Sequence, residues 1–234
     1  MFNLFKNKTN HQSDLQLASD LTSAFSLGFP PKSKEAIKFI EKATDRKEIA
    51  DKIISLCIDI NDPRAYHYIA MSYGIKGTKF RPKVIEFLNK YLQNPVFENV
   101  NRHYSTEQFY NITNKEIELG VVYENLGSAY EGEYDFENAL TSYLKAYEIN
   151  PYNTPIYCRL ATIYSKMHNL DKSISLLKEA KRSAYYKVLK WTDVAGIKRT
   201  DNTFKTVIDD QLKNYESKKD KGYIYKPRKI KTLK

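Results

Sequence analysis

The sequence predicts an all-α protein in which antiparallel helix pairs repeat along the chain and a last helix caps the array. Three observations predict this class. Apolar residues recur at intervals of three and four positions, which is the spacing of one helix face. Capping residues and prolines separate these stripes, and no segment predicts a β-strand. Two consecutive segments in the C-terminal half share one pattern with a period of 34 residues.

The N-terminal half predicts five helices, each with a start or stop signal. The signals are Gly28–Pro31, Ser33, Asp45 with Glu48, Asp62–Pro63 and Asn94–Pro95. Asp45 and Glu48 resemble a capping box, in which each side chain bonds the free backbone N–H of the other residue. The proline after Asp62 suits a first helical turn, where its missing N–H leaves no bond unmade. Residues 94–113 are less regular, and we expect part of this segment to pack through Phe97, Tyr104 and Phe109.

The C-terminal half carries a sharper pattern, with helices predicted to start at Asn114, Asp135, Thr154 and Asp171. The first pair of helices shows the pattern Tyr123-x-x-Leu126-Gly127-x-x-Tyr130, followed by Ala139, Tyr143, Ala146 and Pro151. The same positions 34 residues later hold Tyr157, Leu160, Ala161, Tyr164, Ser173, Leu177 and Ala180. This pattern resembles the tetratricopeptide repeat, a helix pair with aromatic residues, Leu-Gly and Tyr on its first helix. Gly127 and its small counterparts stand where two helices must approach closely.

The resemblance covers residues 120–187, fits residues 63–96 more loosely and fits residues 33–62 only as a degenerate repeat. It implies a short right-handed solenoid with a C-terminal capping helix. Two repeats alone bury too little surface, so the N-terminal helices and the cap must complete the core. The predicted layout is a flexible N-terminus (1–12), a helical region with degenerate repeats (13–113), two clear repeats (114–187), a linker and capping helix (188–217) and a basic, disordered tail (218–234). The apolar stripe of the cap is Phe204, Val207, Ile208 and Leu212, and Trp191 is expected to pack in the segment that joins it.

Proteins of this family present a concave groove, lined by the first helix of each repeat, in which they receive peptides or partner helices. The resemblance places eight residues in that groove: Val121, Glu124, Ser128, Glu131, Cys158, Arg159, Thr162 and Lys166. His67 and Met71 are further candidates on a looser alignment. One subclass grips a terminal carboxylate with a Lys and an Asn one turn apart. Because Glu124 and Ser128 occupy those positions here, we do not expect such a clamp, and the mixed charges favour a polar or basic partner segment.

The net charge of +10 belongs mainly to the last seventeen residues, which hold eight basic residues against one acidic residue. Nine residues of this tail are candidate contacts: Lys218, Lys219, Lys221, Tyr223, Tyr225, Lys226, Arg228, Lys229 and Lys231. A segment this charged cannot bury enough surface to fold alone. It is a solubilising end, a contact for acidic protein or nucleic acid in which the tyrosines stack on bases, or a contact for anionic lipid.

The sequence lacks the patterns of a catalytic or metal site. The four histidines, at positions 11, 67, 103 and 168, have no second ligand at helical spacing, and there is no Cys-x-x-Cys pair. Cys57 and Cys158 stand alone, without a nearby histidine to activate them. The acidic pairs Asp59/Asp62 and Asp209/Asp210 are interpreted as a cap region and a solvated helix face. We therefore expect no enzyme activity and no cofactor.

A signal peptide pattern is absent, and so is a run of about 18 apolar residues that could span a membrane. Lone cysteines suit a reducing compartment, so a cytoplasmic location is expected. The leading hypothesis is an adaptor or scaffold that binds a protein or peptide in the groove. The alternatives are a nucleic-acid-associated factor that uses the basic tail and a peptide-sensing bacterial regulator. No pattern in the sequence specifies an oligomeric state.

Overall fold

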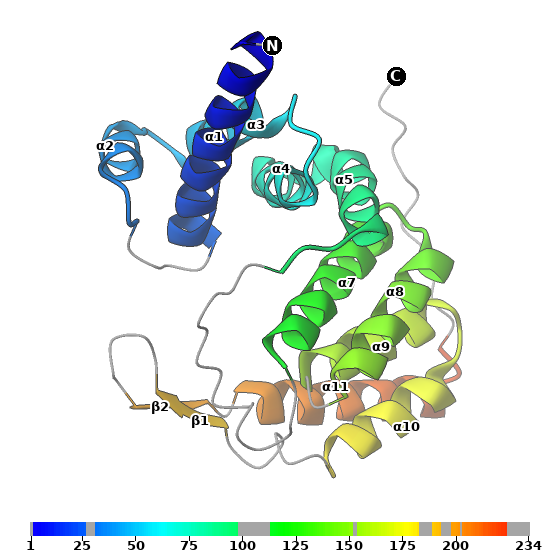
Figure 1. Ribbon diagram of the computed structural model, residues 1–234. Helices are drawn as coiled ribbons and strands as arrows, with labels where there is room; N and C mark the ends of the chain where they lie inside the picture. Colours follow the sequence, from blue (N-terminus) through cyan, green and yellow to red (C-terminus); the bar gives the residue numbers. More distant parts are fainter. Residues whose placement is uncertain are drawn as a thin grey trace. The chain divides into compact units, whose positions relative to one another are not determined.

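The computed structural model describes residues 2–26, 31–97, 113–151, 154–182, 189–192, 198–201 and 203–223. The chain divides into two compact units, residues 1–99 (unit 1) and 100–234 (unit 2). The helices of each unit are labelled in Figure 1. The predicted helical class is confirmed in both units, and each unit is described by itself below.

Every regular element in the described residues of unit 1 is a helix. Its elements are α1 (Phe2–Ser26), α2 (Lys34–Lys42), α3 (Arg46–Cys57), α4 (Pro63–Lys76), the 3₁₀ turn η1 (Thr78–Phe80) and α5 (Arg81–Gln93). Helix α4 packs against both α3 and α5, and α1 packs against α3 and α4. Leu21, Ile53, Ile69 and Leu88, one from each of these helices, are fully buried. Residues 2–12, predicted as a flexible N-terminus, lie in α1.

The predicted caps of unit 1 are present, with one difference. Ser33 accepts the backbone N–H of Ala36, and Asp62 accepts that of Arg64. Asp45 caps α3, but its partner in the predicted capping box bonds elsewhere. The Glu48 carboxylate accepts the backbone N–H of Thr44 at 2.9 Å. Glu48 therefore bonds Thr44, the residue before the cap, rather than Asp45. Thr44 also donates its hydroxyl to Glu48.

Unit 2 contains the two helix pairs predicted from the 34-residue pattern. They are α7 (Asn114–Gly132) with α8 (Phe136–Ile149), and α9 (Thr154–Lys166) with α10 (Leu170–Ala180). Helix α8 also packs on α9, so the pairs stack in sequence order. Asp135 caps α8 as predicted. Helix α10 starts earlier than predicted, because Asn169 rather than Asp171 is its cap.

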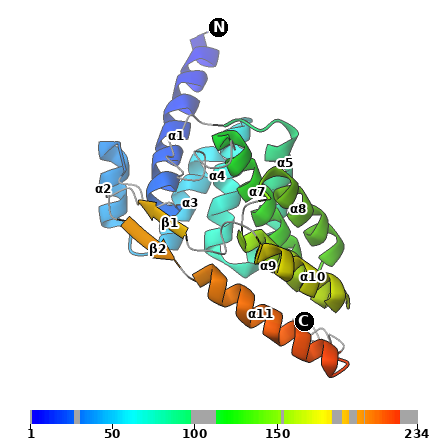
Figure 2. The same ribbon diagram turned by 90° about the horizontal axis from the view of Figure 1, so that it is seen from below.

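A last helix, α11 (Thr203–Asp220), packs against α10 and α9. Figure 2 shows α11 running alongside the α9–α10 pair. Ile208, Leu212 and Tyr215 are buried in the same core cluster as the repeats. This is the predicted capping helix, but it continues past residue 217. Lys218 and Lys219, assigned to the tail from sequence, are helical. Residues 224–234, with the tail candidates Tyr225, Lys226, Arg228, Lys229 and Lys231, lie outside the described residues.

Two short strands precede α11 and were not predicted. Strands β1 (Leu189–Thr192) and β2 (Lys198–Asp201) pair antiparallel, with Leu189 opposite Asp201 and Thr192 opposite Lys198. Trp191 lies in β1, and its side chain is outside the described part of the structure. The prediction of no strand is wrong here because four residues are too few for an alternating pattern to show, and β2 reads Lys-Arg-Thr-Asp.

Candidate protein-interaction face

The first helix pair of unit 2 is closed by a ring packed on a glycine. Tyr143 of α8 is fully buried. A Cβ atom added to Gly127 of α7 would lie 2.6 Å from two atoms of that ring, closer than any van der Waals contact. Only glycine fits at this position without movement, which is what the sequence pattern predicted. The tight contact fixes how α7 presents the rest of its surface.

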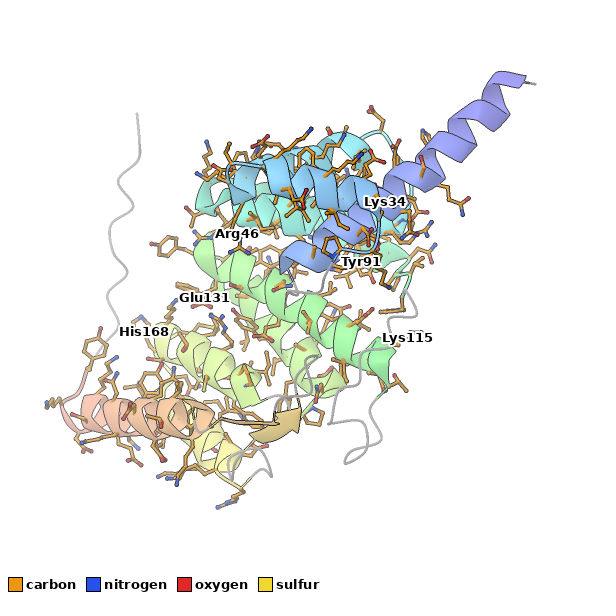
Figure 3. The ribbon with its side chains drawn as sticks, turned by 90° about the vertical axis from the view of Figure 1, so that its left-hand side faces the viewer. Lys34, Arg46, Tyr91, Lys115, Glu131 and His168 are labelled. Carbon is orange, nitrogen blue, oxygen red and sulfur yellow. The ribbon has the colours of Figure 1, made fainter. Side chains whose placement is uncertain are left out.

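The eight residues predicted to line a groove come from α7 and α9, and they are called here the α7–α9 face. Val121 and Arg159 are exposed. The other six are half-buried: Glu124, Ser128, Glu131, Cys158, Thr162 and Lys166. Figure 3 labels Lys115 and Glu131, which mark the two ends of α7. The face therefore runs along this helix and continues onto the first helix of the next repeat.

Two ion pairs join α7 to α9 on this face. Lys166 Nζ lies 2.6 Å from Glu131 Oε1, and both side chains are largely buried. Arg159 Nε lies 3.9 Å from Glu124 Oε1, with 48% of the arginine side chain exposed. The structure thus brings together two acidic and two basic residues that sequence analysis assigned to partner contacts. In this conformation they contact one another across the repeat boundary.

Glu131 takes part in more side-chain contacts than its sequence position indicates. Its Oε2 atom accepts the Tyr143 hydroxyl at 2.8 Å, so one carboxylate serves both a ring within its own repeat and a lysine of the next. The Lys166 ammonium also lies 5.4 Å from the centre of the Phe136 ring. Burial, with the adjacent Glu131 charge, raises the pKa of Tyr143, so the hydroxyl stays protonated and donates. Glu131 and Lys166 therefore fix the packing between the two repeats.

Helix α11 approaches the α9 side of the face. Gln211 Nε2 donates to Thr162 Oγ1 at 3.1 Å, and the Tyr215 hydroxyl lies 3.4 Å from the same oxygen. Thr162 in turn donates to the backbone carbonyl of Cys158 at 2.8 Å. Burial raises the pKa of the Cys158 thiol to about 11, so little thiolate is present at neutral pH. The side chain of Thr162 is thus occupied by contacts within the chain.

Sequence analysis missed Gln211 and Tyr215, although a signal was present. The run Ile208-x-x-Gln211-Leu212-x-x-Tyr215 has the spacing of Tyr157-x-x-Leu160-Ala161-x-x-Tyr164 one helix pair earlier. Its place after α10 is also that of a first helix. The pattern was obscured because residues 181–202 intervene between α10 and α11, whereas only residues 150–153 separate α8 from α9. Helix α11 occupies the position that the first helix of a third repeat would take.

Two models of the tetratricopeptide repeat match the chain, over residues 121–153 and 142–175. The second match starts within α8, so together they cover both helix pairs of unit 2 except the start of α7 and the end of α10. Residues 121–175 of this chain therefore carry tetratricopeptide repeats. Proteins of this class typically serve as interaction scaffolds, and the matched residues include all eight positions of the α7–α9 face.

Solved structures with a similar course of the chain include other repeat proteins. A crystal structure of MamA aligns at 15% identity and a TM-score of 0.49, covering 82% of this chain and 97% of that one. The thermophilic repeat protein TTC0263 of Thermus thermophilus aligns at 15% identity and 0.40, covering 75% and 92%. BtubC of P. vanneervenii aligns at 14% identity and 0.43, covering 97% and 95%. Because all three TM-scores are below 0.5, the assignment rests on the repeat matches. No curated protein matches the sequence significantly.

The described residues contain no group of three His, Cys, Asp or Glu side chains placed to hold a metal ion. The thiol of Cys57 is buried in unit 1, and burial raises its pKa to about 12. None of the helices in the described segments has an apolar stretch long enough to cross a bilayer.

The described start of the basic tail is attached to α11. The Lys218 ammonium lies 5.3 Å from the centre of the Tyr215 ring and 5.0 Å from that of Tyr223. Lys219 Nζ is 2.5 Å from Asp171 Oδ1 at the start of α10, and Lys221 is exposed. These contacts tie the end of α11 to the second repeat. The structure leaves Tyr223 exposed, with 45% of its surface accessible.

Proposed function

We propose that this protein is a non-catalytic scaffold that binds a polypeptide segment on the α7–α9 face, in a reducing, cytoplasmic setting. The observation that carries the proposal is the pair of ionic contacts between α7 and α9. They differ in length and exposure, and that difference assigns them different roles.

The Glu131–Lys166 contact is short, buried and shared with Tyr143, so it serves the packing of the repeats. The Glu124–Arg159 contact is 3.9 Å long, and its arginine is half exposed. A pair of this length with a half-exposed arginine contributes little to stability, so Arg159 can exchange Glu124 for a charged group on a bound polypeptide. Val121, with 42% of its surface exposed, adds an apolar contact on the same helix.

Both free cysteines support the assignment of compartment and the absence of thiol chemistry. Cys57 and Cys158 form no disulfide, and burial raises the pKa of each thiol. A buried protonated thiol is a poor nucleophile, and a chain with two unpaired cysteines suits a reducing environment.

The test is an affinity purification from the native cell with charge variants of the face. We expect Glu124→Arg and Arg159→Glu each to lose the partner. The double variant Glu124→Arg/Arg159→Glu restores the contact between α7 and α9 while exchanging the charges that a partner meets. It should keep the melting temperature of the natural chain and still fail to bind.

The matched control is Glu148→Arg, an exposed carboxylate on α8, away from the α7–α9 face. It makes the same change in net charge as Glu124→Arg and should retain the partner. Retention of the partner by both single reversals would place the binding surface elsewhere.

A second candidate function is nucleic-acid binding through the tail, and the contacts of Lys218 favour it. This lysine lies against the rings of Tyr215 and Tyr223, and the sequence after Tyr223 carries five more basic residues. Cation and ring together suit a stacked base and its phosphate. Because α11 ends at Asp220, the appropriate deletion removes residues 224–234 and leaves the helix intact. Binding by the tail should be lost with the deletion and should weaken steeply with salt, whereas polypeptide binding on the α7–α9 face should change modestly.

A further inference from the structure

Unit 1 carries a continuous row of four aromatic rings along the seam between α4 and α5. Tyr66 and Tyr73 are seven residues apart on one side of α4, and Phe80 and Phe87 are seven apart across η1 and α5. The ring centroids of Tyr66 and Phe87 are 6.2 Å apart, those of Phe87 and Tyr73 6.0 Å, and those of Tyr73 and Phe80 5.4 Å. Phe87 is buried, whereas the other three rings keep part of their surface accessible. We call these four residues the ring row.

Lysine side chains lie over this row. The Lys90 ammonium is 4.8 Å from the centre of the Phe87 ring and 5.9 Å from that of Tyr66. Lys76 and Lys79 lie 5.2 and 4.9 Å from the centre of Phe80. Long basic side chains commonly rest their stems on apolar surface while the charged group stays in water. Here Lys90 and Lys79 place positive charge at the two ends of the ring row, whereas Lys76 is paired with Asp51 of α3.

The charge of this segment is not balanced by its own carboxylates. Residues 76–90 contain five basic residues and one acidic residue, Glu86. Glu86 is shared, because Lys83 and Lys90 both lie 2.8 Å from its carboxylate oxygens. The side chains of these two lysines are 53% and 44% exposed. The first repeat of unit 2 has the opposite character, with eight acidic residues and two lysines over residues 113–151. The positive field is therefore a local property of the α4–α5 seam.

Partly exposed rings beside exposed cations match the two chemical parts of a single-stranded nucleic acid. Bases stack on aromatic faces, and phosphates pair with lysines. An acidic peptide would use the lysines but carries no aromatic bases to stack on the rings. A duplex keeps its bases stacked inside and would likewise leave the rings unused. We propose that the α4–α5 seam of unit 1 binds single-stranded nucleic acid, with bases on the ring row and phosphates on Lys79, Lys83 and Lys90.

The test is fluorescence anisotropy with the full chain and labelled oligothymidylate and oligouridylate of about 12 nucleotides, comparable to one single-strand site. Lys79→Gln/Lys90→Gln should weaken binding about tenfold and lower the slope of log affinity against log salt by about one to two, since each phosphate contact on a single strand contributes about 0.7. Tyr73→Leu, which removes a ring and keeps an apolar side chain, should weaken binding about tenfold with little change in that slope.

The control is Lys145→Gln in unit 2. Its ammonium lies 5.3 Å from the centre of the Tyr123 ring, so it has the same local geometry in an acidic surrounding. It should leave affinity unchanged. Melting temperatures of all variants separate loss of binding from loss of folding. The two labelled strands also show whether RNA or DNA is preferred.

A second series with residues 224–234 deleted separates this site from the tail. The proposal requires binding that survives the deletion and remains sensitive to Lys79→Gln/Lys90→Gln. Binding that disappears with the tail and ignores the lysine variants would overturn it. Equal affinity for a polyglutamate peptide, or for a duplex of the same length, would also overturn it, because the ring row would then have no role. Each of these results leaves the polypeptide proposal for unit 2 untouched.

Discussion

The two tetratricopeptide repeats of unit 2 pack the same helix pair with different residues. In the first, Gly127 of α7 faces the buried ring of Tyr143. The equivalent residues 34 positions later are Ala161 and Leu177, both fully buried. A larger side chain on the first helix is accompanied by a smaller one on the second. The comparison teaches that the repeat conserves the volume shared between facing positions rather than either residue, as expected of a close-packed core.

The backbone between the paired helices is the same in both repeats. Tyr134 and His168, which are 34 residues apart, both have a φ of 63°. This is the left-handed region of backbone conformation, which residues other than glycine rarely adopt. Each is closely followed by a capping residue, Asp135 or Asn169. The turn therefore repeats even where the residues that suit it best are absent.

The largest effect is expected from exchanging residues between the two repeats. Gly127→Ala should destabilise the protein by about 3 kcal/mol, because the new methyl group overlaps a ring that cannot move in a filled core. The double variant Gly127→Ala/Tyr143→Leu copies the second repeat and should recover part of that loss. The recovery stays partial because Tyr143→Leu removes the hydrogen bond to Glu131. Urea unfolding of the four chains gives the coupling energy directly.

Gly120→Ala is the matched control in the same helix. A Cβ atom there meets its nearest neighbours at 3.8 to 3.9 Å, an ordinary contact. Alanine in a helix interior should then stabilise by about 0.5–1 kcal/mol. Additive effects of Gly127→Ala and Tyr143→Leu would contradict the interpretation that the two positions share one volume.

A smaller loss is expected at the boundary between the repeats. Glu131→Ala removes the acceptor of both Tyr143 and Lys166 and should destabilise by about 2 kcal/mol, since the buried Tyr143 hydroxyl and the half-buried Lys166 ammonium lose their partner. Glu133→Ala, two residues later and exposed, should change stability by less than about 0.5 kcal/mol. Thermal unfolding of the two variants measures the difference. Equal melting temperatures would show that the Glu131 network contributes nothing to the repeat boundary.

Much of unit 2 could be predicted because the signals are local. Gly127 and Asp135 act on residues a few positions away or one helix away, and sequence spacing reveals them. The capping box formed by Thr113 and Glu116 is equally local, but it was overlooked at the start of α7. Asn169 was missed because an aspartate two residues later also suits a cap.

The candidate face was harder to predict because its contacts join distant residues. Spacing assigned Glu131 and Lys166 to one face, but it could not show that their side chains meet at 2.6 Å. The contact of Gln211 with Thr162 crosses 49 residues, including the long connection between α10 and α11. Such pairs depend on how helices cross, which a single sequence does not encode in its periodicity.

The smallest change in stability is expected at the turn that the two repeats share, between their paired helices. Variants there separate the contribution of the backbone conformation from that of the side chain. His168→Gly should stabilise by about 0.5 kcal/mol, because relief of roughly 1–2 kcal/mol of left-handed strain exceeds the extra freedom that glycine gives the unfolded chain. Tyr134→Gly should change stability by about zero, since it also removes the edge-to-face contact with Phe136 at 6.1 Å. His168→Ala keeps the strain and should bring no gain in the urea midpoint. If His168→Gly proved no more stable than His168→Ala, the side chain at this turn would matter more than its backbone, and the two repeats would differ where the dihedral angles make them look alike.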